Sequence, residues 1–415
     1  MKLKRVVITG LGTINPLGHN LNETWENAIK GVSGCGLITH FDASKFKTQF
    51  ACEVKNYDPN EYFDRKEGRK LDLFAQFALI AAKEAIENAN FLDTIDKDEV
   101  GVIWGSGIGG ITTFYDGVMD FSEGGQIPRF NPFFIPKLIG DIAAGMISIK
   151  YGFRGPNFGT VSACASSTNA LIEAFNYIRF GKAIAIVSGG SEATINQPGI
   201  GGFNSMQALS TNNEEYMTAS RPFCKTRDGF VMGEGGAAIV LEEYEHAVKR
   251  GANIYAEIVG GGTSADAYHI TATHPDGDGA KLCMERALKD AEMSPEEIDY
   301  VNVHGTSTPV GDIPELLAIQ KVFGGHAYKM NISSTKSMTG HMLGAAGAME
   351  ATFSIMAIKD GIVPPTINHK EWDPQIDERL NLTLHNAQKR NINAALSNTF
   401  GFGGHNASVI FKKIS

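Results

Sequence analysis

The segment Gly159-Thr-Val-Ser-Ala-Cys-Ala-Ser-Ser-Thr-Asn-Ala-Leu-Ile-Glu-Ala-Phe-Asn-Tyr-Ile178 decides how this chain folds. Its first five residues form a strand-like run, and the residues from Asn169 onward have the spacing of a helix. Ser166, Ser167 and Thr168 can cap the first turn of that helix, and Gly181 can end it. A strand that passes almost directly into a helix is typical of α/β architecture.

A cysteine, Cys164, lies at this junction. The free N–H groups and the positive dipole end of a helix N-terminus favour a thiolate over a thiol. Most free cysteines, however, are small buried hydrophobic residues. The local pattern therefore leaves two interpretations open, a nucleophile and a core residue.

Two histidines occupy similar junctions further along the chain. His304 ends the apolar run from Tyr300 to Val303, and His341 precedes the Gly/Ala-rich run 342–356, which suits a helix packed closely inside the protein. A lone histidine in such a place is more often a hydrogen-bonded core residue than a catalyst. Two histidines and a cysteine, all at strand or helix ends, lead to the hypothesis that the three converge in one site.

The order of predicted elements repeats along the chain. Strand-like runs begin near residues 6, 100, 159 and 183 in the first half, and near residues 254, 300, 394 and 407 in the second half. Their alternation with helical segments predicts an α/β fold with largely parallel sheets. We expect two pseudo-symmetric halves, residues 1–251 with Cys164 and residues 252–415 with both histidines, packed so that the helix starts at Cys164 and His341 meet.

The composition of the 415-residue chain is that of an ordinary soluble enzyme, with 43% hydrophobic and 20% charged residues. Apolar runs are too short to span a membrane, and the N-terminus turns directly into a strand, so we expect a cytoplasmic protein. Five separated cysteines without a CxxC pair fit a reducing compartment. The net charge of −9 argues against non-specific nucleic-acid binding. Because the chain lacks a Walker sequence, a dinucleotide fingerprint and metal-ligand histidine spacing, we expect neither a metal nor a bound cofactor.

A cysteine with two histidine donors suits acyl transfer through a thioester. One class with this chemistry is the cysteine hydrolases, whose histidine can lie roughly 130–150 residues after the cysteine, a range that the spacing from Cys164 to His304 fits. The other class forms carbon–carbon bonds, and there the two N–H donors would stabilise an enolate oxygen.

Several longer motifs carry a resemblance that covers nearly the whole chain. They are Val6-Val-Ile-Thr-Gly-Leu-Gly12, Ala163-Cys-Ala-Ser-Ser167, Arg227-Asp-Gly-Phe230, Gly233-Glu-Gly235, His304-Gly-Thr-Ser-Thr-Pro309, Lys336-Ser-Met-Thr-Gly-His341 and Phe400-Gly-Phe-Gly-Gly404. With them the chain resembles the elongating, type II β-ketoacyl-[acyl carrier protein] synthases of the thiolase-like superfamily. The resemblance implies two βαβαβαββ-type halves that form a layered αβαβα sandwich.

The resemblance also implies an activity. It is the decarboxylative Claisen condensation of malonyl-[acyl carrier protein] with an enzyme-bound acyl thioester, which gives 3-oxoacyl-[acyl carrier protein] in fatty acid elongation. A ketosynthase of a polyketide or aryl-polyene pathway is the close alternative, and a cysteine hydrolase is the remote one.

The resemblance assigns roles to individual residues. Cys164 would carry the acyl chain, the N–H groups of Cys164 and Phe402 would form an oxyanion hole, and His304 and His341 would assist decarboxylation. Lys336 would orient His341 or tune local charge, with an ion pair to Glu350 as the alternative. The pantetheine arm would bind Thr306, Thr308 and, more weakly, Thr271. The acyl tunnel would involve Ile108, Phe203 and a mobile Phe402, although plain core packing is the alternative for each.

The implied partners are an acidic acyl carrier protein, which carries the substrates on its phosphopantetheine, and a second copy of the chain. For carrier docking we expect Lys66, Arg69 and Lys70, whose spacing of three and four residues places them on one helical face. For the homodimer, the apolar pair Phe133-Phe134 suits an interface.

Overall fold

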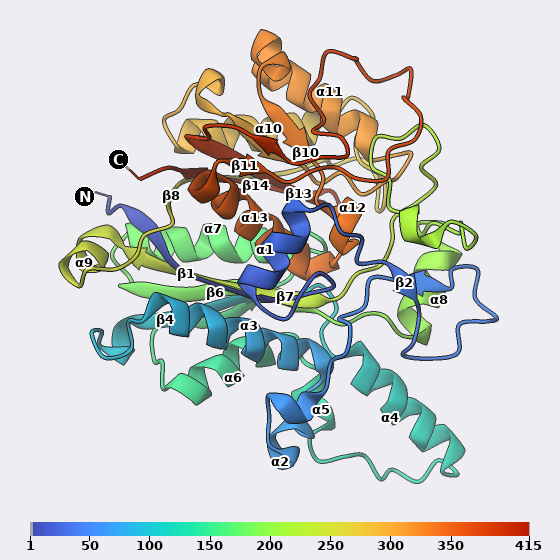
Figure 1. Cartoon of the computed structure of the whole chain (residues 1–415). Helices are drawn as coiled ribbons and strands as arrows, with labels where there is room; N and C mark the ends of the chain where they lie inside the picture. The colour runs from blue at the N-terminus through green and yellow to red at the C-terminus, as the bar shows by residue number, and fades with distance from the viewer. Residues whose placement is uncertain (1–2, 415) are drawn as a thin grey trace.

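The computed structural model describes residues 3–414 and is built around a ten-stranded sheet (Figure 1). In spatial order its strands are β10 (Asn331–Ser333), β9 (Tyr300–Asn302), β13 (Ala394–Gly401), β14 (His405–Lys412), β8 (Ala256–Ala265), β1 (Val6–Ile14), β7 (Gly235–Glu243), β6 (Ala185–Glu192), β4 (Val100–Gly105) and β5 (Asn157–Thr160). Two small antiparallel pairs are β2 (Gly36–Leu37) with β3 (Phe50–Ala51), and β11 (Ile362–Val363) with β12 (Gln388–Lys389).

Helices cover both faces of this sheet, and others project beyond it (Figure 1). The helices are α1 (Leu21–Ile29), α2 (Arg65–Gly68), α3 (Leu73–Ala89), α4 (Ile111–Glu123), α5 (Phe134–Leu138), α6 (Ile142–Tyr151), α7 (Ser166–Arg179), α8 (Gln197–Ser205), α9 (Tyr244–Lys249), α10 (Asp278–Asp290), α11 (Asp312–Phe323), α12 (Lys336–Thr339) and α13 (Ala346–Asp360). Short 3-10 helices are η1 (Pro59–Glu61), η2 (Lys97–Glu99), η3 (Tyr216–Thr218), η4 (Pro295–Glu297), η5 (Gly324–Tyr328) and η6 (Leu343–Ala345). Within residues 3–414, no helix combines the length and apolarity that a membrane crossing requires.

The two halves of the sheet have the same topology. The order β1-β7-β6-β4-β5 in one half corresponds to β8-β14-β13-β9-β10 in the other. In each half the last three strands are parallel and the first two are antiparallel to their neighbours. The halves join where β1 pairs with β8, at Val6 opposite Ile258. This correspondence confirms the predicted α/β fold of two pseudo-symmetric halves. The expectation of largely parallel sheets is wrong, because five of the nine strand pairings in the large sheet are antiparallel.

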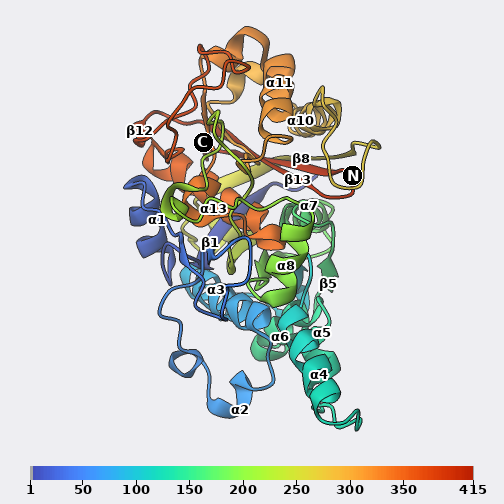
Figure 2. The same ribbon diagram turned by 90° about the vertical axis from the view of Figure 1, so that its right-hand side faces the viewer.

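Three large apolar cores fill the space between the layers of helices and strands. Figures 1 and 2 show these layers. Helices α7 and α13 lie between the two half-sheets and share the central core with β1 and β7. Helix α3 covers the outer face of the first half-sheet, and α10 and α11 cover that of the second. Every residue of α13 from Ala346 to Ile358 is buried, as the Gly/Ala-rich composition predicts.

The junction before α7 differs from the prediction in two details. The strand ends at Thr160, so residues 161–165 form a turn and not a strand end. The predicted side-chain cap is wrong, because Ala165 occupies the N-cap position. The hydroxyl of Ser167 instead accepts a hydrogen bond from the backbone N–H of Ala348 in α13, at 2.9 Å. This bond connects α7 to α13. Gly181, with a φ of +72° that is typical of a helix C-terminus, follows the end of α7 at Arg179 as predicted.

Candidate active site

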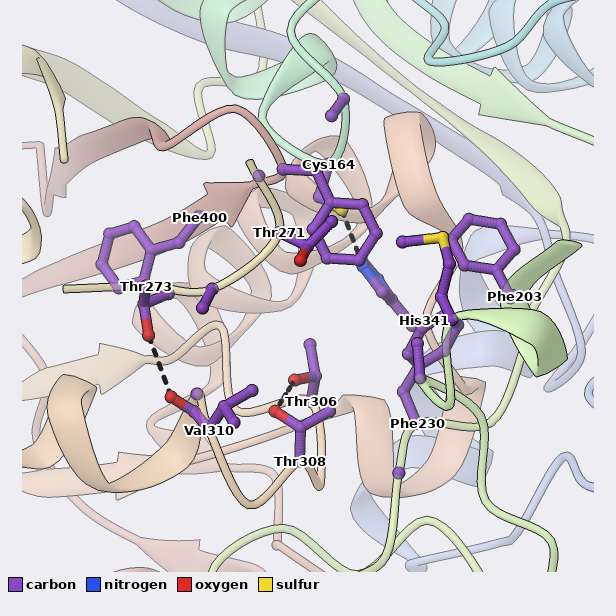
Figure 3. A pocket seen from close by; sticks show the side chains of 18 of the residues that line it. Cys164, Phe203, Phe230, Thr271, Thr273, Thr306, Thr308, Val310, His341 and Phe400 are labelled. Atoms are coloured by element: carbon purple, nitrogen blue, oxygen red, sulfur yellow. Dashed lines mark hydrogen bonds between the residues drawn. The ribbon is translucent and has the colours of Figure 1, made fainter. Parts of the chain in front are cut away.

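The structure brings Cys164, His304 and His341 together at the junction of the two halves. Figure 3 shows Cys164 and His341 facing each other. Cys164 lies in the turn between β5 and α7, His304 follows β9, and His341 follows α12. The sulfur of Cys164 is 3.0 Å from Nε2 of His341. Together with one ring nitrogen of His304, these atoms lie within 4.8 Å of one another. The two imidazole rings are almost perpendicular, at 87°, with their centroids 5.2 Å apart.

The backbone before Cys164 has a sharp turn. Ala163 adopts a φ of +51°, a left-handed conformation that is costly for a residue with a side chain. The hydroxyl of Ser166 holds this turn, since it donates to the carbonyl of Ala163 at 2.7 Å and accepts the N–H of Ser162 at 2.9 Å. Strain of this kind recurs at functional sites, where the surrounding structure fixes one side chain in a defined position.

Cys164 is a thiol in this environment. Burial raises the pKa of Cys164 to about 12, although the positive charge of Lys336 and the backbone N–H of Phe402 both lower it. The expectation of a thiolate is therefore wrong for the unacylated site, because desolvation outweighs the favourable charges. The contact with His341 is nevertheless a path along which a proton can pass between sulfur and imidazole.

Both histidines are neutral near pH 7. Burial lowers the pKa of His304 and of His341 well below 6.5, and the charge of Lys336 lowers both further. A neutral imidazole carries one N–H and can donate one hydrogen bond to an oxygen atom in the cavity. The site can thus supply two uncharged N–H donors next to a thiol.

Lys336 and Glu350 form a buried ion pair behind the two histidines, with exposed fractions of 1% and 2%. Burial raises the pKa of Glu350 to about 7, although Lys336 lowers it. The structure thus contains the ion pair between Lys336 and Glu350 that the sequence left as an alternative. The ammonium of Lys336 also lowers the pKa of Cys164 and of both histidines.

Two further buried glutamates support the site, and the sequence analysis missed both. Glu315 of α11 accepts the backbone N–H groups of His304 and Gly305, each at 2.8 Å. Burial raises its pKa to about 7. These bonds fix the backbone that carries His304, so Glu315 positions the imidazole without touching the cavity.

Glu192, at the end of β6, connects the two halves near the cavity wall. Its carboxylate accepts the N–H of Gly107 at 2.7 Å, of Ile108 at 3.2 Å and of Gly344 at 3.0 Å. Burial raises its pKa to about 7 as well. Because its partners are backbone groups of distant segments, only the three-dimensional structure reveals this connection.

A cavity of about 510 Å³ opens beside Cys164 (Figure 3). Its lining includes the three central residues and all six predicted substrate-binding residues, Ile108, Phe203, Thr271, Thr306, Thr308 and Phe402. Thr306 and Thr308 lie with their hydroxyl oxygens 3.0 Å apart on one side of the cavity. The lining is thus apolar where phenylalanines and Ile108 contribute, and polar where the threonines lie.

Phe402 lies in a glycine-rich turn next to Cys164. Its backbone N–H lowers the pKa of the Cys164 thiol, and the centroid of its ring lies 6.2 Å from that of Phe203. A side chain on Gly401 would come within 3.0 Å of the Cys164 nitrogen, so only glycine permits this approach. Gly403 and Gly404 have φ values of +85° and +75°, which glycine adopts without strain.

One group of side chains at the site has its ligand atoms close enough together to hold a metal ion. Cys164 and the two histidines are close enough for a soft ion such as Zn²⁺, but such an ion would first have to displace the thiol proton. Separately, Asn302 and Ser397 pair across β9 and β13, and a side-chain oxygen of each is buried without a hydrogen-bond partner in residues 3–414. Such oxygens are ligands for a hard cation.

The basic residues predicted for carrier docking lie elsewhere, at α2. Helix α2 covers only Arg65–Gly68, so Lys66 is in the helix while Arg69 is its C-cap and Lys70 follows it. The prediction of one shared helical face is therefore wrong. All three side chains are exposed, and the Lys70 ammonium lies 5.4 Å from the ring of Phe133, next to α5.

Comparisons with known proteins agree with this site. Residues 3–247 match the model of the beta-ketoacyl synthase N-terminal domain, and residues 255–370 match that of its C-terminal domain. The chain is 49% identical to 3-oxoacyl-[acyl-carrier-protein] synthase 2 of Staphylococcus aureus (strain N315), over 99% of this chain and 98% of that relative. It is 47% identical to the protein of the same name from Coxiella burnetii, over the full length of both.

Solved structures show the same family likeness. A beta-ketoacyl synthase from Burkholderia phymatum is 35% identical, with a TM-score of 0.91, and the match covers 99% of this chain and 100% of that one. A ketosynthase solved in complex with its type II PKS acyl-carrier protein is 34% identical, with a TM-score of 0.91 and the same coverage. The chain belongs to the β-ketoacyl synthase family.

Proposed function

We propose that this protein elongates fatty acids by condensing an enzyme-bound acyl group with malonyl-[acyl carrier protein]. As a β-ketoacyl synthase, the chain is an acyltransferase that forms a carbon–carbon bond. The observation that carries the proposal is the thiol of Cys164 with two neutral imidazoles beside it, at one cavity.

In the first step, the sulfur of Cys164 attacks the thioester carbonyl of the acyl carrier. Its proton passes to His341, 3.0 Å away, and from there to the departing carrier thiol. The N–H groups of Cys164 and Phe402 stabilise the negative oxygen of the tetrahedral intermediate. In other enzymes, losing one such donor costs about 3–4 kcal/mol of barrier.

In the second step, malonyl-[acyl carrier protein] loses CO2, and the electrons of the broken bond form an enolate. His304 and His341 donate their N–H groups to the enolate oxygen, which neutral imidazoles can do without losing a proton. The enolate carbon then attacks the acyl carbonyl on Cys164. The new carbon–carbon bond forms, the carbon–sulfur bond breaks, and the Cys164 thiolate takes up one proton from solvent by way of His341, 3.0 Å away.

The rest of the cavity suits the two parts of the substrate. Thr306, Thr308 and Thr271 offer hydroxyl groups to the amides of the pantetheine arm. Ile108 and Phe203 offer an apolar wall for the acyl chain. The substrates bring the phosphopantetheine with them, so the proposed reaction needs no separate cofactor.

The proposal favours fatty acid elongation over a polyketide or aryl-polyene pathway. The curated relatives at 47–49% identity are 3-oxoacyl-[acyl-carrier-protein] synthases, whereas the type II PKS ketosynthase is 34% identical. A specialised ketosynthase is the second candidate, because it shares the fold at a TM-score of 0.91.

Intact-mass measurement of the protein after incubation with an acyl carrier tests the function. We expect a stable acyl adduct that malonyl-[acyl carrier protein] converts to 3-oxoacyl product. Cys164→Ala should lose both adduct and product, while the control Cys283→Ala, a buried cysteine outside the cavity, should retain both. Condensation by Cys164→Ala, or release of free acid by the wild type without malonyl carrier, would contradict the proposal.

A homodimer and a division of the chain after residue 251 are part of the proposal. Exposed apolar side chains gather on and around α4 and α5: Phe114, Val118, Ile127, Phe130, Phe133 and Ile135. A surface of this kind suits a contact with a second copy. We expect sedimentation at micromolar concentration to give a dimer, and Phe133→Glu combined with Ile135→Glu to shift the protein towards monomer.

The division of the chain falls between the end of α9 at Lys249 and the start of β8 at Ala256.

A further inference from the structure

Two cysteines that the reaction does not use flank one end of the β2–β3 pair, Cys35 just before β2 and Cys52 just after β3. Gly36 pairs with Ala51 and Leu37 with Phe50, so the next positions in register are Cys35 and Cys52. The N–H of Ile38 bonds the carbonyl of Gln49, and that of Cys52 bonds Met232 outside the pair.

This alternation makes Cys35 and Cys52 a non-hydrogen-bonded pair, in which Cα atoms are about 4.5 Å apart. That separation lies within the range of roughly 4.4–6.8 Å that a disulfide spans. Both side chains belong to one small buried cluster with Phe50, Ala219 and Val231, and the neighbouring Cys35 thiol, with burial, raises the pKa of Cys52. The backbone register therefore gives the two cysteines a spacing that a disulfide can span.

The pair lies directly behind the segment that leads to His341. The sulfur of Cys52 is 4.0 Å from the carbonyl of Met338, and a Cβ on Gly340 would meet that sulfur at 2.9 Å. The N–H of Gly34, next to Cys35, bonds the same Met338 carbonyl at 2.8 Å. Both cysteines thus belong to the support of the backbone that positions the His341 imidazole.

We propose that Cys35 and Cys52 form a redox-sensitive dithiol that hydrogen peroxide oxidises to a disulfide, and that this disulfide slows condensation. The sulfur of Cys35, which is 5% exposed against 1% for Cys52, attacks one peroxide oxygen. The O–O bond breaks, and a sulfenic acid and water form. The sulfur of Cys52 then displaces the hydroxyl, so that the S–S bond and a second water form. Two thiols thus lose two hydrogens and two electrons, and one peroxide is reduced to two waters.

The effect on the reaction follows from the position of the Cys52 sulfur. Bonding to Cys35 draws this sulfur away from Gly340 and Met338, and the support of the His341 backbone changes. In a reducing compartment such a bond is transient, as is typical of redox-sensing cysteines. The effect on rate rests on the proposed function, whereas formation of the bond does not.

The other cysteines have different surroundings. Cys164 is buried with a pKa of about 12, so its reactive thiolate is scarce. The sulfur of Cys224 contacts the Thr226 hydroxyl, and that of Cys283 lies near the Gly262 carbonyl. The pKa of Cys52 is raised as well, so the pair differs from these cysteines in another respect. Cys35 and Cys52 lie in one buried cluster, so each has a second thiol with which a disulfide can close.

Peptide mapping tests the bond. Trypsin cuts after Lys30, Lys45, Lys47 and Lys55, which places Cys35 in peptide 31–45 and Cys52 in peptide 48–55. After treatment with hydrogen peroxide and alkylation of free thiols, we expect the two peptides joined, two hydrogens lighter than their sum, and separated by dithiothreitol. Oxidation of other cysteines while these two remain alkylated would overturn the proposal.

Activity of the same samples tests the consequence. We expect condensation to fall by roughly tenfold and to recover with dithiothreitol, since a displacement of about 1 Å can cost up to a hundredfold in rate. Cys35→Ser should keep its activity under the same peroxide, with Cys52→Ala as a second variant if the first does not fold, while the control Cys283→Ser should respond like the wild type. Full activity of the linked protein would overturn the effect on His341. Inactivity of the reduced wild type would instead count against the proposed function.

Discussion

At Cys164, burial and charge act on the sulfur in opposite directions. The sulfur lies next to the start of α7, the Phe402 N–H and the Lys336 charge, all of which favour a thiolate. Burial nevertheless raises the pKa of Cys164 to about 12. The nucleophile is therefore formed during the reaction, by proton transfer to His341, and is not stored as an anion.

Alkylation of Cys164 should follow from this pKa. Below a pKa of about 12 the thiolate fraction rises about tenfold per pH unit, so the rate of alkylation by iodoacetamide should rise steadily from pH 7 to 9 without a plateau. Lys336→Met should slow alkylation, because it removes the positive charge that lowers the pKa of Cys164. Glu350, with a pKa of about 7, can take up a proton when its partner Lys336 is lost. Glu350→Gln should accelerate it. A plateau near pH 7 in the wild type, measured by mass spectrometry, would contradict the assignment.

The residues of the site differ in how well the sequence reveals them. Cys164, His304 and His341 stand out because each follows or precedes a regular element, and the repeat in element order suggests that they meet. Glu192 and Glu315 give no such signal, because their partners are backbone N–H groups. Any carboxylate in a buried segment could have had that role, and only the folded chain decides which one does.

At the scale of elements, the close approach of α7 and α13 depends on glycine. A Cβ on Gly347 would meet the hydroxyl of Thr168 at 2.0 Å. Composition alone predicted that α13 is buried, since Gly and Ala leave little side chain between neighbouring backbones. It did not predict which helix α13 contacts.

Two glycine-to-alanine changes should have opposite effects. Gly347→Ala should lower the free energy of unfolding by about 1–3 kcal/mol, because overpacking separates α7 from α13. Gly145→Ala in α6 should raise it by roughly 0.5–1 kcal/mol, because nothing lies within 4 Å of its Cβ and alanine is the better helix former. Urea unfolding of both variants checks the signs, and stabilisation by Gly347→Ala would show that the helices can separate without cost.

Short elements were harder to predict than long ones. A spacing of three and four residues indicates a helical face only if the helix continues, and α2 ends at Gly68. The cap of α7 failed for a similar reason, because the serines that could cap it bond neighbouring segments instead. Local patterns cannot reveal such competition between local and tertiary partners.

At the scale of the whole molecule, the two halves follow one plan but supply different chemistry. The first half contributes the thiol and the second contributes both imidazoles, from corresponding ends of β5, β9 and β10. The repeated order of elements was readable from the sequence. The β1–β8 pairing that joins the halves was not, because pairing of edge strands leaves no periodic signal.

The net charge of −9 has a consequence for the proposed carrier. Acyl carrier proteins are acidic, so docking needs a local positive surface on this acidic protein. The exposed residues Lys66, Arg69 and Lys70 supply one near α5. Solvated charges of this kind act mainly through association rate and salt sensitivity.

Charge reversal at this surface should therefore weaken the use of carrier-bound substrate alone. We expect Lys66→Glu with Arg69→Glu to raise KM for the acyl carrier several-fold, and to leave acylation by a small thioester nearly unchanged. The double variant Lys249→Glu with Lys289→Glu, on exposed positions of α9 and α10, changes the net charge equally and serves as the matched control. If the control raises KM as much, overall charge and not the α2 surface governs docking. If both substrates lose activity together at Lys66 and Arg69, the surface supports the fold and not the carrier.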